Sequence, residues 1–314
     1  MADYFEIIPL DTLFFRGSTP MESGMMNVVS AFPPPVSVIK GAFWTALHSD
    51  NGDYKSTLDE NGNIPLEVAG IFIKKIDKEK KVKYYAPAPA TWYYDNDKKI
   101  SSGEKIEGIK LIKAKKMPET EKLGMTSSAG EVVFVKAEKD SKSLAGAWVS
   151  IDFLKNPNPK FGKNDVLFEG DILSKENRTN VALDENRKAK DGQLFSSTHL
   201  RLNEGISLVV GFTEERALPD EGKFLFGGEK RLSKFKRLKE DEFNLNGFDG
   251  SSFVSLVPIE AKDETIKAIV SSGKIFVTSG WDMAKGFHKP TVSWIPAGAV
   301  FNSKINNSCI PLGK

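Results

Sequence analysis

The sequence contains few of the residues on which metal sites and nucleophilic enzymes depend. Its 314 residues include one cysteine, Cys309, and three histidines, His48, His199 and His288. A single cysteine excludes a disulfide framework within the chain and is typical of a reducing compartment. The histidines show no metal-ligand spacing and no Cys/His dyad, and no HExxH or GxSxG motif is present. We therefore expect no metal and no other cofactor.

Long hydrophobic runs are also missing. No uninterrupted apolar stretch approaches the ~18 residues of a membrane-spanning helix, and the acidic first residues (Asp3, Glu6, Asp11) lack the layout of a secretory signal. Hydrophobic residues make up 40% of the chain and charged residues 27%, which is ordinary for a soluble globular protein. We expect a cytoplasmic protein without a membrane partner. The length predicts one large domain or two unequal ones.

A strong excess of positive charge is lacking too, because the formal net charge is only +2. Binding to a phosphate backbone depends on local clusters of basic residues, however, and such clusters are present. The clusters are Lys74–Lys83, Lys110–Lys116 and Lys230–Lys239. The first two are interpreted as solvated surface, because they lie in stretches that are predicted to be peripheral. The third directly follows a pair of glycines.

Hydrophobic periodicity predicts an α+β protein with antiparallel sheets, since strands outnumber helices throughout. A strand at 4–9 and a loop over 10–32 precede a helix from Ser37 to about His48, whose apolar face contains Val36, Ile39, Phe43 and Leu47. Further strands are expected at 68–76, 82–85, 109–113, 131–136, 166–172, 178–183, 193–202, 206–212, 253–259, 274–278 and 292–295, with helices at 148–154 and 263–272 and a polar insertion over 95–146.

The entry to the first helix is a candidate anion site. With Ser37 as N-cap, Lys40 occupies the third helical position and Gly41 follows it. A cation there opposes the helix dipole, and no acidic residue in that turn compensates it. A bound anion, held by free backbone N–H groups and the Lys40 ammonium, would explain the arrangement. The alternative is a tolerated surface lysine.

A glycine-rich loop, Phe226–Arg231, is the second candidate. Gly227 and Gly228 permit positive φ and close backbone approach, and the cations Lys230 and Arg231 follow directly. The loop does not match the G-x-x-x-x-G-K-[ST] pattern, so nucleotide hydrolysis is not predicted. Taken alone, Gly-Gly-Glu is more typical of a hairpin turn.

Two further elements have the residue types that bind nucleic acid. The segment 178–195 predicts an extended hairpin with a polar tip, in which Arg178 and Arg187 are phosphate candidates; an ordinary surface hairpin is an equal alternative. In the loop 280–290, Trp281 can stack on an unpaired base, and His288 and Lys289 can donate to phosphate or base edges. A tryptophan is, however, more often part of a core.

The two ends of the chain resemble a single family. Residues 9–17 (PLDTLFFRG), 280–290 and 295–301 are each a short strand that runs into a Gly/Pro turn presenting a basic or aromatic side chain. Together they resemble the third subunit of the Cmr complex, a type III-B CRISPR effector, which belongs to the RAMP superfamily of RNA-binding Cas proteins. The resemblance covers 4–48, 178–212, 226–231 and 280–301 and is absent from about 95–146. His288 and Trp294 depart from it, because less bulky or basic residues are expected there.

The resemblance implies two ferredoxin-like (RRM-type) modules. The larger would span 1–245, with the insertion at 95–146 and a thumb-like hairpin near 178–198, and the smaller 246–314. It also implies that Lys40 contacts the guide-RNA backbone and that the glycine-rich loop binds RNA phosphates. Arg16 is expected to bind RNA or a partner. Asp11 is interpreted as an acceptor that orders its loop, because its motif differs from that of the RNA-cleaving subunits.

The function implied is that of a non-catalytic subunit in antiviral defence. It would bind and position the repeat-derived 5′ tag of the crRNA, bridge the large signature subunit to the backbone RAMP subunits, and meet target RNA only indirectly. One alternative is a metal-independent endoribonuclease that processes guide RNA, with His199 or His288 as general base, although His199 lies in a predicted strand and is better explained as structural. The other is a protein-only scaffold, which would lack the steep salt dependence of RNA binding.

Overall fold

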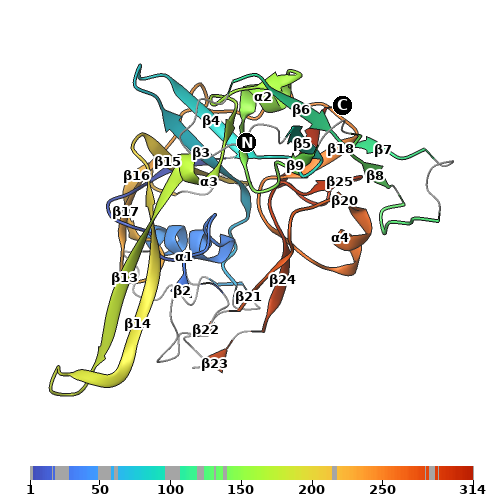
Figure 1. Cartoon of the computed structure of the whole chain (residues 1–314). Helices are drawn as coiled ribbons and strands as arrows, with labels where there is room; N and C mark the ends of the chain where they lie inside the picture. The colour runs from blue at the N-terminus through green and yellow to red at the C-terminus, as the bar shows by residue number, and fades with distance from the viewer. Residues whose placement is uncertain are drawn as a thin grey trace.

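The computed structural model confirms an α+β protein that is mostly β, with antiparallel sheets (Figure 1). It describes residues 3–15, 17, 28–48, 58–59, 63–95, 107–118, 124–130, 132–136, 140–213, 218–279, 281–282, 287–288 and 290–313. Four helices occur within these ranges: α1 (Val36–Leu47), α2 (Ile151–Lys155), α3 (Glu169–Ile172) and α4 (Asp263–Ala268). None of the helices in the described ranges is long and apolar enough to cross a membrane.

An eight-stranded antiparallel sheet forms the centre of the molecule, in the order β12-β10-β4-β3-β15-β1-β17-β16. Strand β1 pairs with β15 on one side and with β17 on the other. The strands are β1 (Asp3–Pro9), β3 (Val68–Ile76), β4 (Val82–Pro87), β10 (Trp148–Ser150), β12 (Val166–Leu167), β15 (Ile206–Phe212), β16 (Glu221–Leu225) and β17 (Leu232–Arg237). The predicted hairpin of 68–76 and 82–85 is confirmed as β3–β4.

Helix α1 covers one face of this sheet with the apolar side that the periodicity predicts. Ile39 and Phe43 are completely buried, and Val36 and Leu47 pack against the same core. The Phe43 ring lies 5.0–5.3 Å, centroid to centroid, from four aromatic rings of the sheet; these belong to Phe5, Phe212, Phe224 and Phe235. Such tilted and edge-to-face pairs add to the free energy gained by burial.

The C-terminal part of the chain covers much of the opposite face. Phe72 of β3 and Val209 of β15 share a second core with Leu256, Val300 and Leu312. The small strands on this side form the sheets β20-β25-β18-β26 and β19-β24-β21. They are β18 (Ser252–Ser255), β19 (Ile259–Glu260), β20 (Ile269–Ser271), β21 (Phe276–Thr278), β24 (Val292–Ile295), β25 (Val300–Phe301) and β26 (Cys309–Leu312).

The region around the predicted insertion adds short strands to the side of the molecule. Strand β6 (Ile109–Lys113) confirms one prediction, whereas the segment 131–136 contains only β8 (Val133–Phe134). These strands pair locally, and Trp92 is buried beneath them. The others here are β5 (Trp92–Asp95), β7 (Lys115–Lys116), β9 (Ser141–Ser143) and β11 (Lys160–Phe161).

A long hairpin of β13 (Leu173–Leu183) and β14 (Ala189–Leu202) projects from the body (Figure 1). The strands are longer than predicted because the tip is a tight turn ordered by Asp184. The Asp184 carboxylate accepts hydrogen bonds from the backbone N–H groups of Asn186 and Lys188, and the Asp184 N–H donates to the Lys188 carbonyl. Near its root β14 also pairs in parallel with β2 (Val28–Val29).

Further predicted elements are wrong in their type or extent, among them the segment 253–259, which is divided between β18 and β19. The segment 166–172 is β12 followed by α3, whose start is fixed by a hydrogen bond from the Phe168 N–H to the Asp171 carboxylate. The segment 148–154 begins as β10 before α2, with Ser150 as the N-cap. The helix predicted over 263–272 ends at Ala268, because β20 then pairs with β25.

We predict that Phe43→Ala lowers the free energy of unfolding by about 3–5 kcal/mol, because the cavity would remove contacts with four rings. Denaturant-induced unfolding followed by fluorescence measures it. Val82→Ala is the control: its side chain is 47% exposed, and we expect a change within about 0.5 kcal/mol. Equal effects of the two substitutions would contradict the central role of α1.

Candidate nucleic-acid interface

Three segments that are far apart in the sequence meet at the root of the long hairpin. The loop after β1 (residues 10–15) forms a backbone bridge with β14: the Leu13 N–H donates to the Leu200 carbonyl at 2.7 Å, and the Leu200 N–H to the Leu13 carbonyl at 2.9 Å. The same loop is bound by the glycine-rich loop, whose Gly228 N–H donates to the Phe14 carbonyl at 2.7 Å. We call this meeting point the hairpin junction.

Asp11 occupies the centre of the charges at the hairpin junction. Its carboxylate accepts a hydrogen bond from Arg231, and it lies 3.5 Å from the Arg201 guanidinium and 3.8 Å from that of Arg178. A hydrogen bond from the Thr12 backbone and the three guanidinium groups lower the pKa of Asp11. These contacts are those expected of a carboxylate that orders its loop.

Two further carboxylates complete the balance of charge. Glu176 on β13 accepts hydrogen bonds from Arg201, which lower its pKa, and lies 3.7 Å from Arg178. Glu229 accepts from Arg231 at 2.7 Å. Three guanidinium groups thus face three carboxylates, which we call the junction network. Arg178 and Arg231, predicted as phosphate ligands, already have acidic partners in this structure.

His199 fixes the buried side of the junction. The ring is completely buried, and the Phe14 ring stacks on it at 4.9 Å between centroids. Its Nδ1 lies 3.3 Å from the Thr12 hydroxyl, and its Nε2 lies 3.2 Å from the Ser197 hydroxyl and 3.3 Å from the Glu229 carboxylate. Burial lowers the pKa of His199, although Glu229 partly opposes this effect. The structural interpretation of His199 fits these contacts.

The glycine-rich loop requires its first glycine for packing against its own chain. Gly227 has φ +85°, and a Cβ there would lie 2.6 Å from the Phe14 carbonyl oxygen. Glu229 and Lys230 also have positive φ, at 57° and 53°, a conformation that costs side-chain-bearing residues about 1 kcal/mol or more each. Lys230 is exposed and has no carboxylate partner among the described residues, so it is the cation that the loop leaves available.

The predicted helix-terminal anion site is wrong in its geometry. Helix α1 begins at Val36, with Pro35 as the flanking residue and no side-chain cap, so Ser37 is not the N-cap. The Pro35 carbonyl accepts from the N–H groups of Val38 and Ile39, which starts the helix directly after the prolines. Lys40 is therefore the fifth helical residue. Burial lowers its pKa, while Asp59 and Glu67 favour its charged form. Its contact with RNA stays a prediction.

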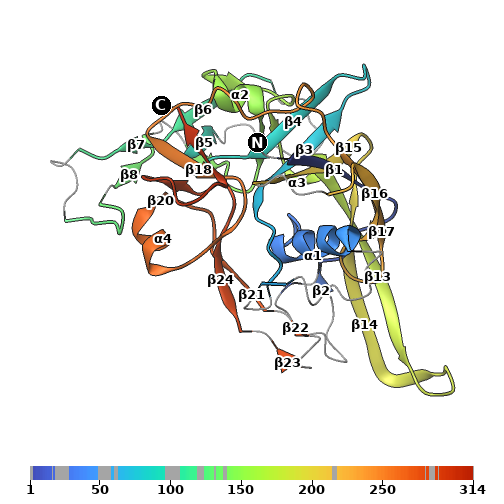
Figure 2. The same cartoon turned by 180° about the vertical axis from the view of Figure 1, so that it is seen from behind.

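The remaining predicted residues make none of the contacts described at the junction, or lie outside the described residues. Gly41 is open, since an added Cβ would meet no atom within 4 Å. Arg187 is exposed at the tip of the long hairpin, with φ 61°. Strands β22 (Trp281–Asp282) and β23 (Phe287–His288) pair at the end of a second projection, on the same side of the body as the hairpin (Figures 1 and 2). The side chains of Trp281 and His288, and the whole of Arg16 and Lys289, lie outside the described residues.

The junction also contains four residues that no pattern in the sequence predicts, namely Thr12, Glu176, Arg201 and Glu229. The contacts of Glu176 and Arg201 depend on the register of β13 and β14, which places Glu176 opposite His199, and those of Thr12 and Glu229 depend on loops that meet from distant parts of the chain. Within the described residues no group of histidine, cysteine and acidic side chains is arranged to hold a metal ion.

The chain belongs to the family described as CRISPR-associated protein (Cas_Cmr3), whose model matches residues 5–249. This confirms the resemblance found from the sequence. The fold is similar to a chain of a type III-B Cmr-beta complex bound to cognate target RNA and AMPPnP, with TM-score 0.57, 17% identity, and coverage of 95% of this chain and 85% of that one. A second structure, of Cmr-beta bound to cognate target RNA, gives TM-score 0.52, 19% identity, and coverage of 95% and 86%. No curated protein matches.

We predict that Gly227→Ala lowers the free energy of unfolding by about 1–3 kcal/mol, because a side chain at positive φ would also clash with the Phe14 carbonyl. Gly41→Ala is the matched control: it lies in a helix with open space and should raise stability by about 0.5–1 kcal/mol. Thermal and denaturant unfolding measure both. A Gly227→Ala variant with the same free energy of unfolding as the wild type would show that the close approach to the Phe14 carbonyl is not required for stability.

We also predict that the protein loses stability as the pH falls below about 6.5, the ordinary value for histidine. The pKa of His199 is lowered in the folded state, so the unfolded chain binds the proton more readily and protonation favours unfolding. The stabilisation is complete above pH 6.5 and is lost as the pH falls through the folded-state value. Unfolding free energies at pH 7.5 and 5.0 should differ more for the wild type than for His199→Gln. Equal differences would contradict this assignment.

Proposed function

We propose that this chain is a non-catalytic RNA-binding subunit of a type III-B CRISPR effector complex, in which it binds and positions the repeat-derived 5′ tag of the crRNA. Membership of the Cas_Cmr3 family supports this assignment. The observation that carries it is the hairpin junction, where the opening loop, the hairpin root and the glycine-rich loop form one surface. The hairpin root contains Arg178 and the glycine-rich loop contains Lys230 and Arg231, which the sequence predicts to bind RNA, and the loop after β1 leads to Arg16, which is expected to bind RNA or a partner.

The order of the central strands supports the finer description of the fold as ferredoxin-like. Strands β3-β15-β1-β17 are neighbours in that order, and α1 connects β1 to β3 across β15. A ferredoxin-like module has this arrangement for its first helix and four strands. Between β15 and β17, where such a module has its second helix, the described residues contain the edge strand β16. The division into domains 1–245 and 246–314 stays a prediction.

The junction network suggests how the roles are divided among the basic residues. Lys230 is exposed and faces no described carboxylate, so it is suited to a phosphate contact. Arg178 and Arg231 are held by Asp11, Glu176 and Glu229, so they fix the loops in place. The tip residue Arg187 and the loop 280–290 would contact RNA farther from the body.

The proposal also includes partners and location. The large signature subunit and the backbone RAMP subunits are the expected protein partners, with target RNA met only indirectly, and we place the complex in the cytoplasm. The endoribonuclease alternative is weakened by the complete burial of His199, which shields its ring from an RNA ribose. The protein-only scaffold differs from our proposal in a measurable way, because it should bind no RNA at low salt.

The first test is to purify the chain with its native partners and to sequence the RNA that accompanies it. Short RNAs that share one 5′ sequence ahead of varied guides are expected. A complex with no RNA, or with random fragments, would leave the scaffold as the better description. Incubation of the isolated chain with repeat RNA in a chelator should give no cleavage products, and specific cleavage would favour the endoribonuclease.

We predict that Lys230→Ala weakens binding to tag RNA and lowers the slope of log K against log salt by about 0.7, the value for one phosphate contact on a single strand. Its melting temperature should stay within experimental error, because the side chain is exposed. Arg231→Ala is expected to lower the melting temperature, since it leaves Asp11 and Glu229 without their shared partner. Filter binding over a salt series measures the first effect. An unchanged slope for Lys230→Ala would remove Lys230 from the interface.

A further inference from the structure

An exposed aliphatic patch lies at one corner of the eight-stranded sheet. It lies on the strands β1, β17 and β16 and on the residue that follows β1, and β16 is the outermost strand of the sheet. Four side chains that are 40–54% exposed form it, and we call them the edge patch; they are Ile8, Leu10, Leu225 and Leu232. Leu225 pairs directly with Leu232, and the Leu10 N–H donates to the Leu232 carbonyl at 3.1 Å.

Strand register places the edge patch on the face of the sheet opposite α1. Side chains alternate along a strand, and Ile7 and Phe235, which are paired, point into the α1 core. Ile8 and its partner Lys234 therefore point the other way. The C-terminal elements cover this second face farther along the sheet, through Phe72 and Val209, but they leave the four aliphatic side chains exposed.

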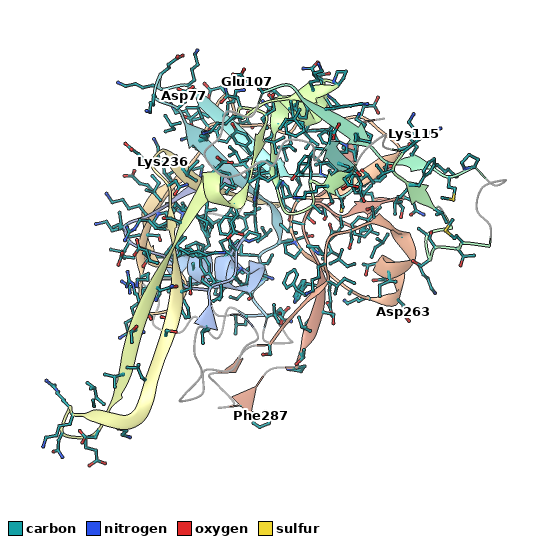
Figure 3. All side chains as sticks on the ribbon, viewed as in Figure 1. Asp77, Glu107, Lys115, Lys236, Asp263 and Phe287 are labelled. Atoms are coloured by element: carbon teal, nitrogen blue, oxygen red, sulfur yellow. The ribbon has the colours of Figure 1, made fainter. Side chains whose placement is uncertain are left out.

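Lysines border the edge patch on the same face. Lys234 lies between Ile8 and Lys223 in the register, and Lys236 occupies the next outward-facing position of β17. All three lysines are exposed, and Lys236 points away from the body in Figure 3. Lys223 and Lys234 are paired directly across two strands, where like charges destabilise a sheet. Among the paired residues of these strands, the carboxylates on this face are Glu221, opposite Lys236, and Glu6, which is bound to Lys74 and Ser207. Glu242, which follows β17, lies on this face too, since its charge raises the pKa of Tyr84 together with that of Glu6.

We infer that the edge patch with Lys223, Lys234 and Lys236 is a docking surface for another protein subunit of the complex, one that presents aliphatic side chains bordered by aspartate or glutamate. The inference rests on the proposed function in one respect, namely that the partner belongs to the same complex. Burial of the four aliphatic side chains would supply the hydrophobic contribution. Carboxylates beside the paired lysines would remove their repulsion and select the partner.

The chemistry of the surface favours an acidic protein over the other two occupants. RNA recognition uses aromatic stacking and hydrogen bonds to base edges, and aliphatic side chains provide neither. A second copy of this chain, joined by a two-fold axis, would bring the same lysines face to face. A protein surface with both aliphatic and acidic side chains would bury the leucines and pair with the lysines.

The first experiment removes the leucines. Leu225→Ser with Leu232→Ser is compared with Ile76→Ser and Val82→Ser, an equally exposed aliphatic pair of β3–β4. Affinities are measured for each other protein subunit of the complex, purified separately, and for tag RNA. We expect the edge-patch variant to weaken binding of one subunit by about tenfold or more. The control variant should bind all subunits normally, and both variants should retain RNA affinity and melting temperature.

The second experiment identifies the occupant directly. A photo-crosslinking amino acid replaces Leu225, or Val82 as the control, in the assembled complex, and the products are mapped by mass spectrometry. A cross-link from position 225 to a segment rich in aspartate or glutamate in another subunit is expected. Cross-links to RNA, to a second copy or to nothing would each overturn the inference.

The two proposals fail in distinguishable ways. A wild-type chain that assembles with no other subunit overturns both of them. A wild-type chain that assembles and carries tagged guide RNA, together with an edge-patch variant that assembles equally well, overturns only the docking surface.

Discussion

Pairing of β1 on both of its edges is the constraint on which the arrangement of the site depends. The strand Asp3–Pro9 is hydrogen-bonded to β15 on one side and to β17 on the other. Two of its own side chains, Phe5 and Ile7, are completely buried in the core. The chain therefore leaves the middle of the sheet in a fixed direction, beside the loop that joins β16 to β17. The loop 10–15 reaches both the glycine-rich loop and the hairpin root, and the hydrogen bonds of Leu13 and Phe14 join all three.

The three arginines at the junction are neutralised by three carboxylates, so the cluster adds no net positive charge to a chain whose formal net charge is +2. Asp11, Glu176 and Glu229 face Arg178, Arg201 and Arg231 at the surface of the protein. Such exposed pairs contribute little individually to stability, but guanidinium groups held by several carboxylates have defined orientations. A phosphate that approached them would compete with carboxylates already in place. Lys230 faces no described carboxylate, so in the proposed interface with RNA it is the cation of this loop that needs no acidic partner to be displaced.

Local patterns in the sequence predicted the elements that local forces determine. The apolar face of α1 and the β3–β4 hairpin follow from periodicity, and the ordering role of Asp11 agrees with its contacts. The start of α1 was misplaced because Pro35 occupies the capping position that Ser37 was expected to take. The partners of Asp11 could not be predicted, because they depend on the register of β13 and β14 and on contacts between segments far apart in the chain. The burial of His199 is likewise set by the Phe14 ring of a distant loop.

The edge patch and the junction network are adjacent in the chain as well as in space. Leu10 precedes Asp11, and Leu232 follows Arg231, so a partner seated on the patch would restrict the same backbone that holds the network. A partner that favours the conformation of these loops in which RNA binds would raise the affinity of the junction for RNA. Thermodynamic linkage requires the effect to be reciprocal: RNA at the junction would strengthen binding of the partner by the same factor by which the partner strengthens binding of RNA. Assembly of the subunit and loading of the guide would therefore favour each other without any rearrangement of the central sheet.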